Sequence, residues 1–192
     1  ASFLGMWTVM MVAMMLPSLL PMLRRYRLAI GEAQEVSLDR LTVLAGAGYF
    51  FVWIIVGLAV FPLGVGLAAL CVELPALAHA VPLAGGVIVF IAGALQFTAW
   101  KARRLACCRK ETSGRLLPAD ARLAWRHGLS LGRRCVCCCG NLMLVLLVVG
   151  MMDLGAMGAV TAAITVERLA PAGERFAQAI GAILAGAGLF LI

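Results

Sequence analysis

The chain has 192 residues and a mass of 20.3 kDa, which is the size of one domain. Hydrophobic residues make up 64% of it and charged residues 13%, whereas soluble domains are roughly half apolar and roughly a quarter charged. These proportions exclude a water-soluble globule, a disordered chain and a secreted disulfide scaffold. The net charge of +7 does not indicate a nucleic-acid partner, because the Lys and Arg residues of membrane proteins collect in cytoplasmic loops. We therefore expect an integral membrane protein embedded in a lipid bilayer.

Five apolar stretches are long enough to cross a bilayer, for which a helix needs about 20 residues. They cover residues 3–23, 41–63, 81–100, 136–166 and 172–192. The sequence thus predicts an all-α fold, a polytopic bundle of about five transmembrane helices that forms a single integral membrane domain over residues 1–192. Because Ala1 is not an initiator Met, a sixth span could precede it in the full protein.

The fourth stretch is longer than a bilayer requires. A continuous helix over residues 136–166 would measure about 45 Å, whereas the hydrocarbon core is roughly 30 Å thick. The stretch is therefore one tilted helix with an end in water, or a helix broken near Gly150 and Gly155. We expect the single long helix.

Basic residues indicate how the spans are oriented. Ten Lys and Arg residues lie between Lys101 and Arg134, against two acidic residues, whereas the segment from Cys71 to Ala80 has no basic residue. Four arginines lie between the first two spans: Arg24, Arg25, Arg27 and Arg40. By the positive-inside rule, the first and third connections are cytoplasmic. We expect a multi-pass protein of the plasma membrane, the inner membrane of a bacterium, with the third connection in the cytoplasm.

Six of the seven cysteines gather in or beside this third connection. They are Cys107, Cys108, Cys135, Cys137, Cys138 and Cys139. Disulfides are rare in the reducing cytosol, so a dense group of thiols there favours a soft metal ion or redox chemistry. The neighbouring arginines favour the thiolate, which is the form that binds metal. The alternative is that the cysteines are inert small hydrophobic residues at the end of a helix.

Helical geometry adds further residues to the cysteines. At 100° per residue, Cys135, Cys138 and Cys139 share one side of the fourth span. On a continuous helix, three more residues lie within about 40° of Cys139 around the helix axis: Met143, Asp153 and Met157. An ionisable residue inside a membrane is a candidate functional residue. The alternative is that Asp153 is satisfied by a neighbouring helix.

The first span contributes methionines. Met6, Met10 and Met14 recur every four residues on one face, whereas Met11 and Met15 lie on another face. Methionine at this spacing is more often packing than ligand, but thioethers beside thiolates select Cu(I).

The remaining polar candidates are three isolated residues. His127 could bind metal or lie at the membrane interface. We expect Gln96 to form a hydrogen bond across helices and Lys101 to extend its ammonium group to the membrane surface.

Three segments of the chain resemble a known family of predicted metal-binding integral membrane proteins, a domain of unknown function sometimes labelled copper chaperone. They are MWTVMMVAMMLPSLLPML from Met6 to Leu23, the Gln96 to Arg109 block with its Gln-x-Thr-x-x-Lys pattern, and CVCCCGNLM from Cys135 to Met143, followed by VGMMDL. The chain departs from the family where Cys137 replaces a usual Gly, Gly140 a usual Trp and Asp153 a usual Asn. The resemblance implies metal handling, with copper as the metal.

Ligand chemistry and the resemblance together predict a protein that binds Cu(I) and delivers it to, or retains it in, a membrane copper system. Four cysteines would capture the ion: Cys135, Cys138, Cys139 and Cys108. A path or second site would use Met10, Met14, Met143, Asp153 and Met157, with Cys137 and His127 as further candidate ligands. Zinc is the other ion that thiolates could hold. The expected partner is a membrane protein or a copper-dependent complex.

Two other functions stay open. One is an accessory structural subunit of a larger membrane enzyme complex. The other is a membrane thiol oxidoreductase, whose active cysteines would face the oxidising side, where only Cys71 is expected. The sequence contains no phosphate-binding loop, no HExxH motif and no plausible Ser/His/Asp set, so it does not favour an enzyme.

Overall fold

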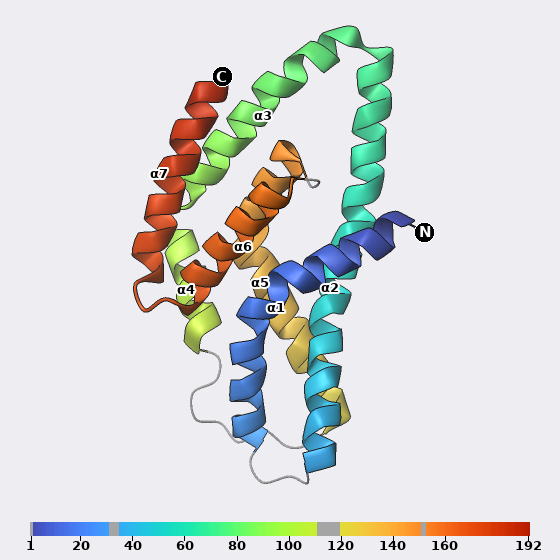
Figure 1. The fold of residues 1–192 in the computed structure, drawn as a ribbon, viewed down its shortest axis with the longest axis vertical. Coiled ribbons are helices and arrows are strands. Elements are labelled where there is room, and N and C mark those ends of the chain that lie inside the picture. The colour runs from blue at the N-terminus through green and yellow to red at the C-terminus, as the bar shows by residue number, and fades with distance from the viewer. Residues whose placement is uncertain (1, 31–34, 111–119, 151–152) are drawn as a thin grey trace. The chain divides into compact units, whose positions relative to one another are not determined.

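The computed structural model describes residues 2–30, 35–110, 120–150 and 153–192. Over these residues the chain forms seven α-helices and no strand, which confirms the all-α prediction (Figure 1). The helices are α1 (Ser2–Ile30), α2 (Glu35–Glu73), α3 (Pro75–Leu95), α4 (Ala99–Lys110), α5 (Ala121–Val149), α6 (Leu154–Leu169) and α7 (Gly173–Leu191).

Four of these helices are long and apolar enough to cross a membrane. The qualifying segments are Phe3–Leu28, Leu38–Glu73, Ala121–Val149 and Gly173–Leu191. A fifth span is obtained if His79–Leu95 and Ala99–Cys108, which are bent by 67° relative to each other, are counted together. By length and composition, the described residues therefore agree with the prediction of about five spans.

The fourth apolar stretch is not the single long helix that we expected. Helix α5 begins well before residue 136 and ends at Val149, and α6 begins at Leu154. Gly150 has a φ of 123°, a conformation that glycine adopts without steric cost. Asp153 then caps α6, because its Oδ1 accepts hydrogen bonds from the backbone N–H groups of Gly155 at 2.7 Å and Ala156 at 3.2 Å. The structure therefore has the other alternative, a helix broken near Gly150.

The chain groups into two compact units. The first unit comprises Ala1–Leu58 and Ala106–Cys137, and the second comprises Ala59–Leu105 and Cys138–Ile192.

Helices α1, α2 and α5 pack closely in the first unit. The Trp7 indole on α1 donates a hydrogen bond to the Trp53 carbonyl on α2 at 2.9 Å. Helix α5 approaches the backbone of α2 at two glycines: a Cβ on Gly128 would touch the Ala45 carbonyl, and one on Gly132 would lie 2.9 Å from the Tyr49 carbonyl. Small residues four apart allow such a close approach between helices.

Helices α3 and α7 lie side by side in the second unit, and α6 packs against α7 (Figure 1). Small residues again line the contact, because a Cβ on Gly93 would meet the backbone of Ala185, and one on Gly188 would meet the backbone of Phe90. Between α3 and α4, residues 96–98 form a turn, so the predicted third span over residues 81–100 is interrupted.

Candidate metal centre

Three buried side chains from three helices meet in the first unit. Cys135 lies on α5, Met15 on α1 and Tyr49 on α2, and each is 0% exposed. The Cys135 thiol donates to the Met15 thioether, with 3.9 Å between Sγ and Sδ. The Tyr49 hydroxyl donates to Cys135 Sγ at 3.0 Å. A thiol, a thioether and a phenol are thus held in contact away from solvent.

Local sequence explains how these groups come together. Gly132 lies three residues before Cys135 on α5 and gives the backbone of α2 room to approach at Tyr49. This close approach lets the phenol reach the sulfur. On α1, the Ser18 hydroxyl donates to the Met15 carbonyl at 3.1 Å.

The other predicted ligands of the first unit have different surroundings. Met10 and Met14 are buried on α1. Cys108 is buried and its thiol points to the Arg134 carbonyl, 3.9 Å away, whereas Cys137 is exposed. His127 stacks on Tyr26 with ring centroids 4.7 Å apart.

The predicted ligands of the second unit lie on two helices rather than one. Cys138, Cys139 and Met143 are buried on the last part of α5. Asp153 is exposed and caps α6, on which Met157 is partly buried. The prediction that Asp153 and Met157 continue the cysteine face assumed a continuous helix, and the break after Val149 makes that alignment wrong.

Acidic, thiol and imidazole groups do not converge on one point in the described part of the chain, where no three His, Cys, Asp or Glu side chains are placed to hold one ion. The four-cysteine capture set draws on residues of both units, and it stays a prediction. The pair that does form combines a cysteine with a methionine.

The Cys135–Met15 pair has the chemistry and spacing of a soft-metal site. Thiolate and thioether sulfurs are the ligands that select Cu(I), whereas protein zinc sites use Cys, His and carboxylates. With about 2.3 Å between a soft ion and sulfur, as in zinc–thiolate bonds, two sulfurs that share the ion lie at most about 4.6 Å apart. The observed separation of 3.9 Å falls within that limit.

Sequence reasoning missed two residues of this centre. Met15 was not taken as a candidate ligand because it lies on another face of the first span than Met6, Met10 and Met14, and Tyr49 was not considered. The Gly128-x-x-x-Gly132 spacing is a signal for close helix packing. It could have directed attention to the partner of α5.

A second polar cluster lies in the other unit. We expected Lys101 to extend its ammonium group outward, but the residue is 1% exposed and its Nζ lies 2.9 Å from Glu167 Oε2. Gln96 Nε2 donates to Glu167 Oε1 at 2.7 Å, which confirms the prediction of a hydrogen bond across helices. Desolvation raises the pKa of Glu167, and the Lys101 ammonium opposes this shift. The buried ion pair with Glu167 thus explains why the Lys101 ammonium group does not extend to solvent.

Comparison with known families gives one match, which spans nearly the whole chain. The profile of the PpoB2 family, described as copper chaperone, matches residues 4–191. Among curated proteins and solved structures, no match was found.

Proposed function

The chain belongs to the PpoB2 copper chaperone family, and on this premise we propose that it is a membrane-embedded Cu(I) carrier. It holds the ion between Cys135 Sγ and Met15 Sδ and delivers it to, or retains it in, a membrane copper system. The observation that carries the proposal is the buried thiol–thioether pair with 3.9 Å between its sulfurs.

Binding at this pair exchanges a proton for the ion. As Cu(I) enters between the two sulfurs, the Cys135 thiol proton that points at Met15 is released to the water that surrounds the protein. The Tyr49 hydroxyl remains beside Sγ and donates a hydrogen bond to the thiolate, which stabilises its negative charge. Complete burial keeps water and oxidants away from both sulfurs.

Exposed thiols provide a first contact for the incoming ion. Cys107 and Cys137 are both exposed in the first unit, and Cys137 follows Cys135 by two residues on α5. In this proposal the exposed thiols receive the ion and the buried pair retains it. Cys138, Cys139 and Cys108 are further ligands in the transfer, as the sequence predicts.

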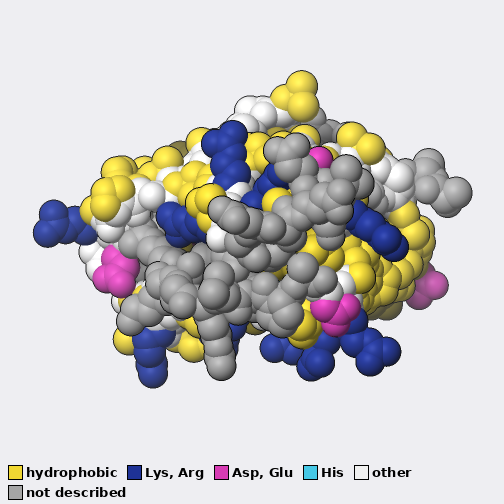
Figure 2. Space-filling model, turned by 90° about the horizontal axis from the view of Figure 1, so that it is seen from below, with side chains coloured by type: hydrophobic (Ala, Val, Ile, Leu, Met, Phe, Trp, Pro, Cys, Tyr) yellow, Lys and Arg dark blue, Asp and Glu magenta, His cyan; other side chains and the backbone are white. Residues whose placement is uncertain are grey.

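Basic side chains support a cytoplasmic orientation for the first unit. Figure 2 shows several Lys and Arg side chains projecting from the face in view, with hydrophobic side chains between them. Among the described side chains of the first unit, the exposed arginines are Arg24, Arg25, Arg27, Arg40, Arg122, Arg126 and Arg133. By the positive-inside rule, we propose that these residues face the cytoplasm and that the apolar helices lie in the bilayer.

The decisive experiment measures copper per chain after anaerobic purification of the full protein in an uncharged detergent. We expect near-stoichiometric copper in the wild type, and copper–sulfur scattering in its X-ray absorption spectrum. Cys135→Ser should lose most of the copper, and Met15→Leu should weaken affinity by at least roughly 10- to 100-fold, because the loss of a group that only supports a ligand already costs that much.

Matched controls come from the same helices. Cys137→Ser removes an exposed thiol of α5 that the proposal uses for entry but not for retention, and Met6→Leu removes a thioether of α1 that is 42% exposed. Both should keep their copper.

Full copper in the Cys135→Ser, Met15→Leu double variant would refute this site. Loss of copper only in a Cys135, Cys138 and Cys139 triple serine variant would move the site to the adjacent thiols. A metal-free wild type with intact thiols would refute the carrier function and favour an accessory subunit.

A further inference from the structure

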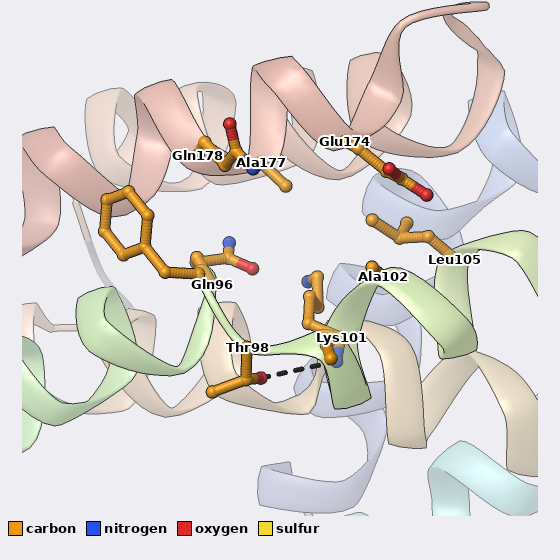
Figure 3. Close-up of a pocket in the computed structure, with 10 residues that line it drawn as sticks. Gln96, Thr98, Lys101, Ala102, Leu105, Glu174, Ala177 and Gln178 are labelled. Carbon is orange, nitrogen blue, oxygen red and sulfur yellow. Dashed lines mark hydrogen bonds between the residues drawn. The ribbon is translucent and has the colours of Figure 1, made fainter.

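The turn between α3 and α4 borders a pocket in the second unit, which the copper proposal does not use. Its volume is about 240 Å³, and its wall is formed by the turn, the start of α4 and one face of α7 (Figure 3). Glu174, Ala177 and Gln178 supply the α7 side, at the spacing that places residues on one helix face. Discontinuous helices in membrane transporters often form binding sites at such breaks.

Gln96 presents an unsatisfied acceptor to this pocket. The residue is 3% exposed, and among the described residues no donor reaches its Oε1. The orientation of the amide is fixed, because Nε2 must face the Glu167 carboxylate at 2.7 Å. Figure 3 shows the carboxamide of Gln96 directed between α7 and Lys101. A buried acceptor without a donor is costly, so this oxygen calls for a ligand that donates.

Lys101 does not supply that donor. Its ammonium group already has three acceptors, namely Glu167 Oε2 at 2.9 Å, the Cys138 carbonyl at 2.7 Å and Asn141 Oδ1 at 3.4 Å. Its backbone N–H is bonded to the Thr98 hydroxyl at 3.3 Å, the dashed line in Figure 3. With the positive charge of Lys101 balanced by Glu167, the remaining formal charge of the pocket wall is the Glu174 carboxylate.

We propose that this pocket binds a small organic cation, whose ammonium group donates to Gln96 Oε1 while the Glu174 carboxylate balances its charge. The described residues that line the pocket include no sulfur and no imidazole, so they do not fit Cu(I). A volume of 240 Å³ corresponds to about eight water molecules at about 30 Å³ each, which is more than a bare metal ion fills. An alkylammonium of a few carbon atoms fits both the charge and the space.

The test is calorimetric titration of propylammonium chloride into the full protein in an uncharged detergent. Empty micelles serve as the blank, and propan-1-ol and sodium chloride serve as comparison ligands. We expect saturable binding of propylammonium and none of the other two. Equal binding of propan-1-ol would refute the role of charge, equal binding of sodium would refute an organic ligand, and no saturable binding would overturn the proposal.

Two variants locate the site. Gln96→Met should weaken binding about tenfold or more, because it removes a hydrogen bond to a charged group. Glu174→Gln, at an exposed position, should weaken it roughly two- to fivefold and leaves the protein folded. Glu73→Gln, which removes an exposed carboxylate outside the pocket wall, is the matched control and should bind as the wild type does.

Unchanged affinity in Glu174→Gln would overturn the assignment even if Gln96→Met did not fold. All three variants should keep their copper, so failure here is distinct from failure of the carrier function.

Discussion

Removing one partner of the buried Lys101–Glu167 ion pair should destabilise the protein far more than removing both. The two side chains are 2% and 1% exposed, and the ammonium and carboxylate groups are 2.9 Å apart. Glu167→Gln preserves the size of the side chain but leaves the ammonium group without an anion. The Cys138 carbonyl and Asn141 still accept hydrogen bonds from Lys101, but neither carries a charge.

The cost follows from desolvation. Breaking a buried pair by removing one partner costs about 3–5 kcal/mol, because the other charge stays buried and uncompensated. In the Lys101→Met, Glu167→Gln double variant no charge remains, and the new glutamine can still accept from Gln96. We expect the free energy of unfolding of the double variant to lie within about 2 kcal/mol of the wild type.

Reversible unfolding by titration with a denaturing detergent, followed by circular dichroism, measures these differences. Arg27→Ala is the matched control, because it breaks the Arg27–Asp39 pair, whose side chains are 43% and 66% exposed, and should cost at most about 1 kcal/mol. A double variant as unstable as Glu167→Gln would show that desolvated charge is not the cause. A Glu167→Gln variant as stable as the wild type would show that the pair is not buried as described.

Three further changes test the fold with the same assay. Gly128→Ala places a Cβ against the Ala45 carbonyl and should cost about 1–3 kcal/mol. Gly140→Ala, on the same helix with nothing within 4 Å, should gain about 0.5–1 kcal/mol, and equal effects of the two would contradict the close packing of α5 on α2. Asp153→Ala should cost about 0.5–2 kcal/mol through loss of the α6 cap and leave the copper content unchanged. Loss of copper in that variant would show that Asp153 is a ligand.

Helix content and the approximate number of spans could be predicted because apolar length is a strong signal. The ends of the helices could not. Arg122, Arg126 and Arg133 interrupt the apolar pattern, yet they lie on the exposed face of α5 while Ala124 and Leu131 are buried. An amphipathic start of a long helix thus looked like a loop when only apolar length was considered.

The break after Val149 could be predicted in part. Glycine was the right residue to suspect, but many glycines in this chain lie inside helices, and only Gly150 has a positive φ among the described residues. An Asp three residues later, placed to cap the next helix, is the feature that separates this glycine from the others.

The candidate metal centre depends on tertiary contacts that one sequence does not display. Cys135 was identified from its chemistry, but its partner Met15 lies 120 residues away. Helical periodicity groups residues of one helix and cannot say which face meets another helix. Lys101 and Glu167 show the same limit, because a lysine near the end of an apolar stretch is read as interfacial until its carboxylate is found.

In the proposed carrier, the enclosure of Met15, Tyr49 and Cys135 would also limit how fast an ion enters or leaves. While α1, α2 and α5 stay packed, no solute reaches the sulfurs, so exchange proceeds through transient openings of these helices. A deeply held ion then leaves at a rate set by helix motion as well as by the strength of its bonds to sulfur. A receiving protein that binds the opened form would raise the population of that form and accelerate the transfer.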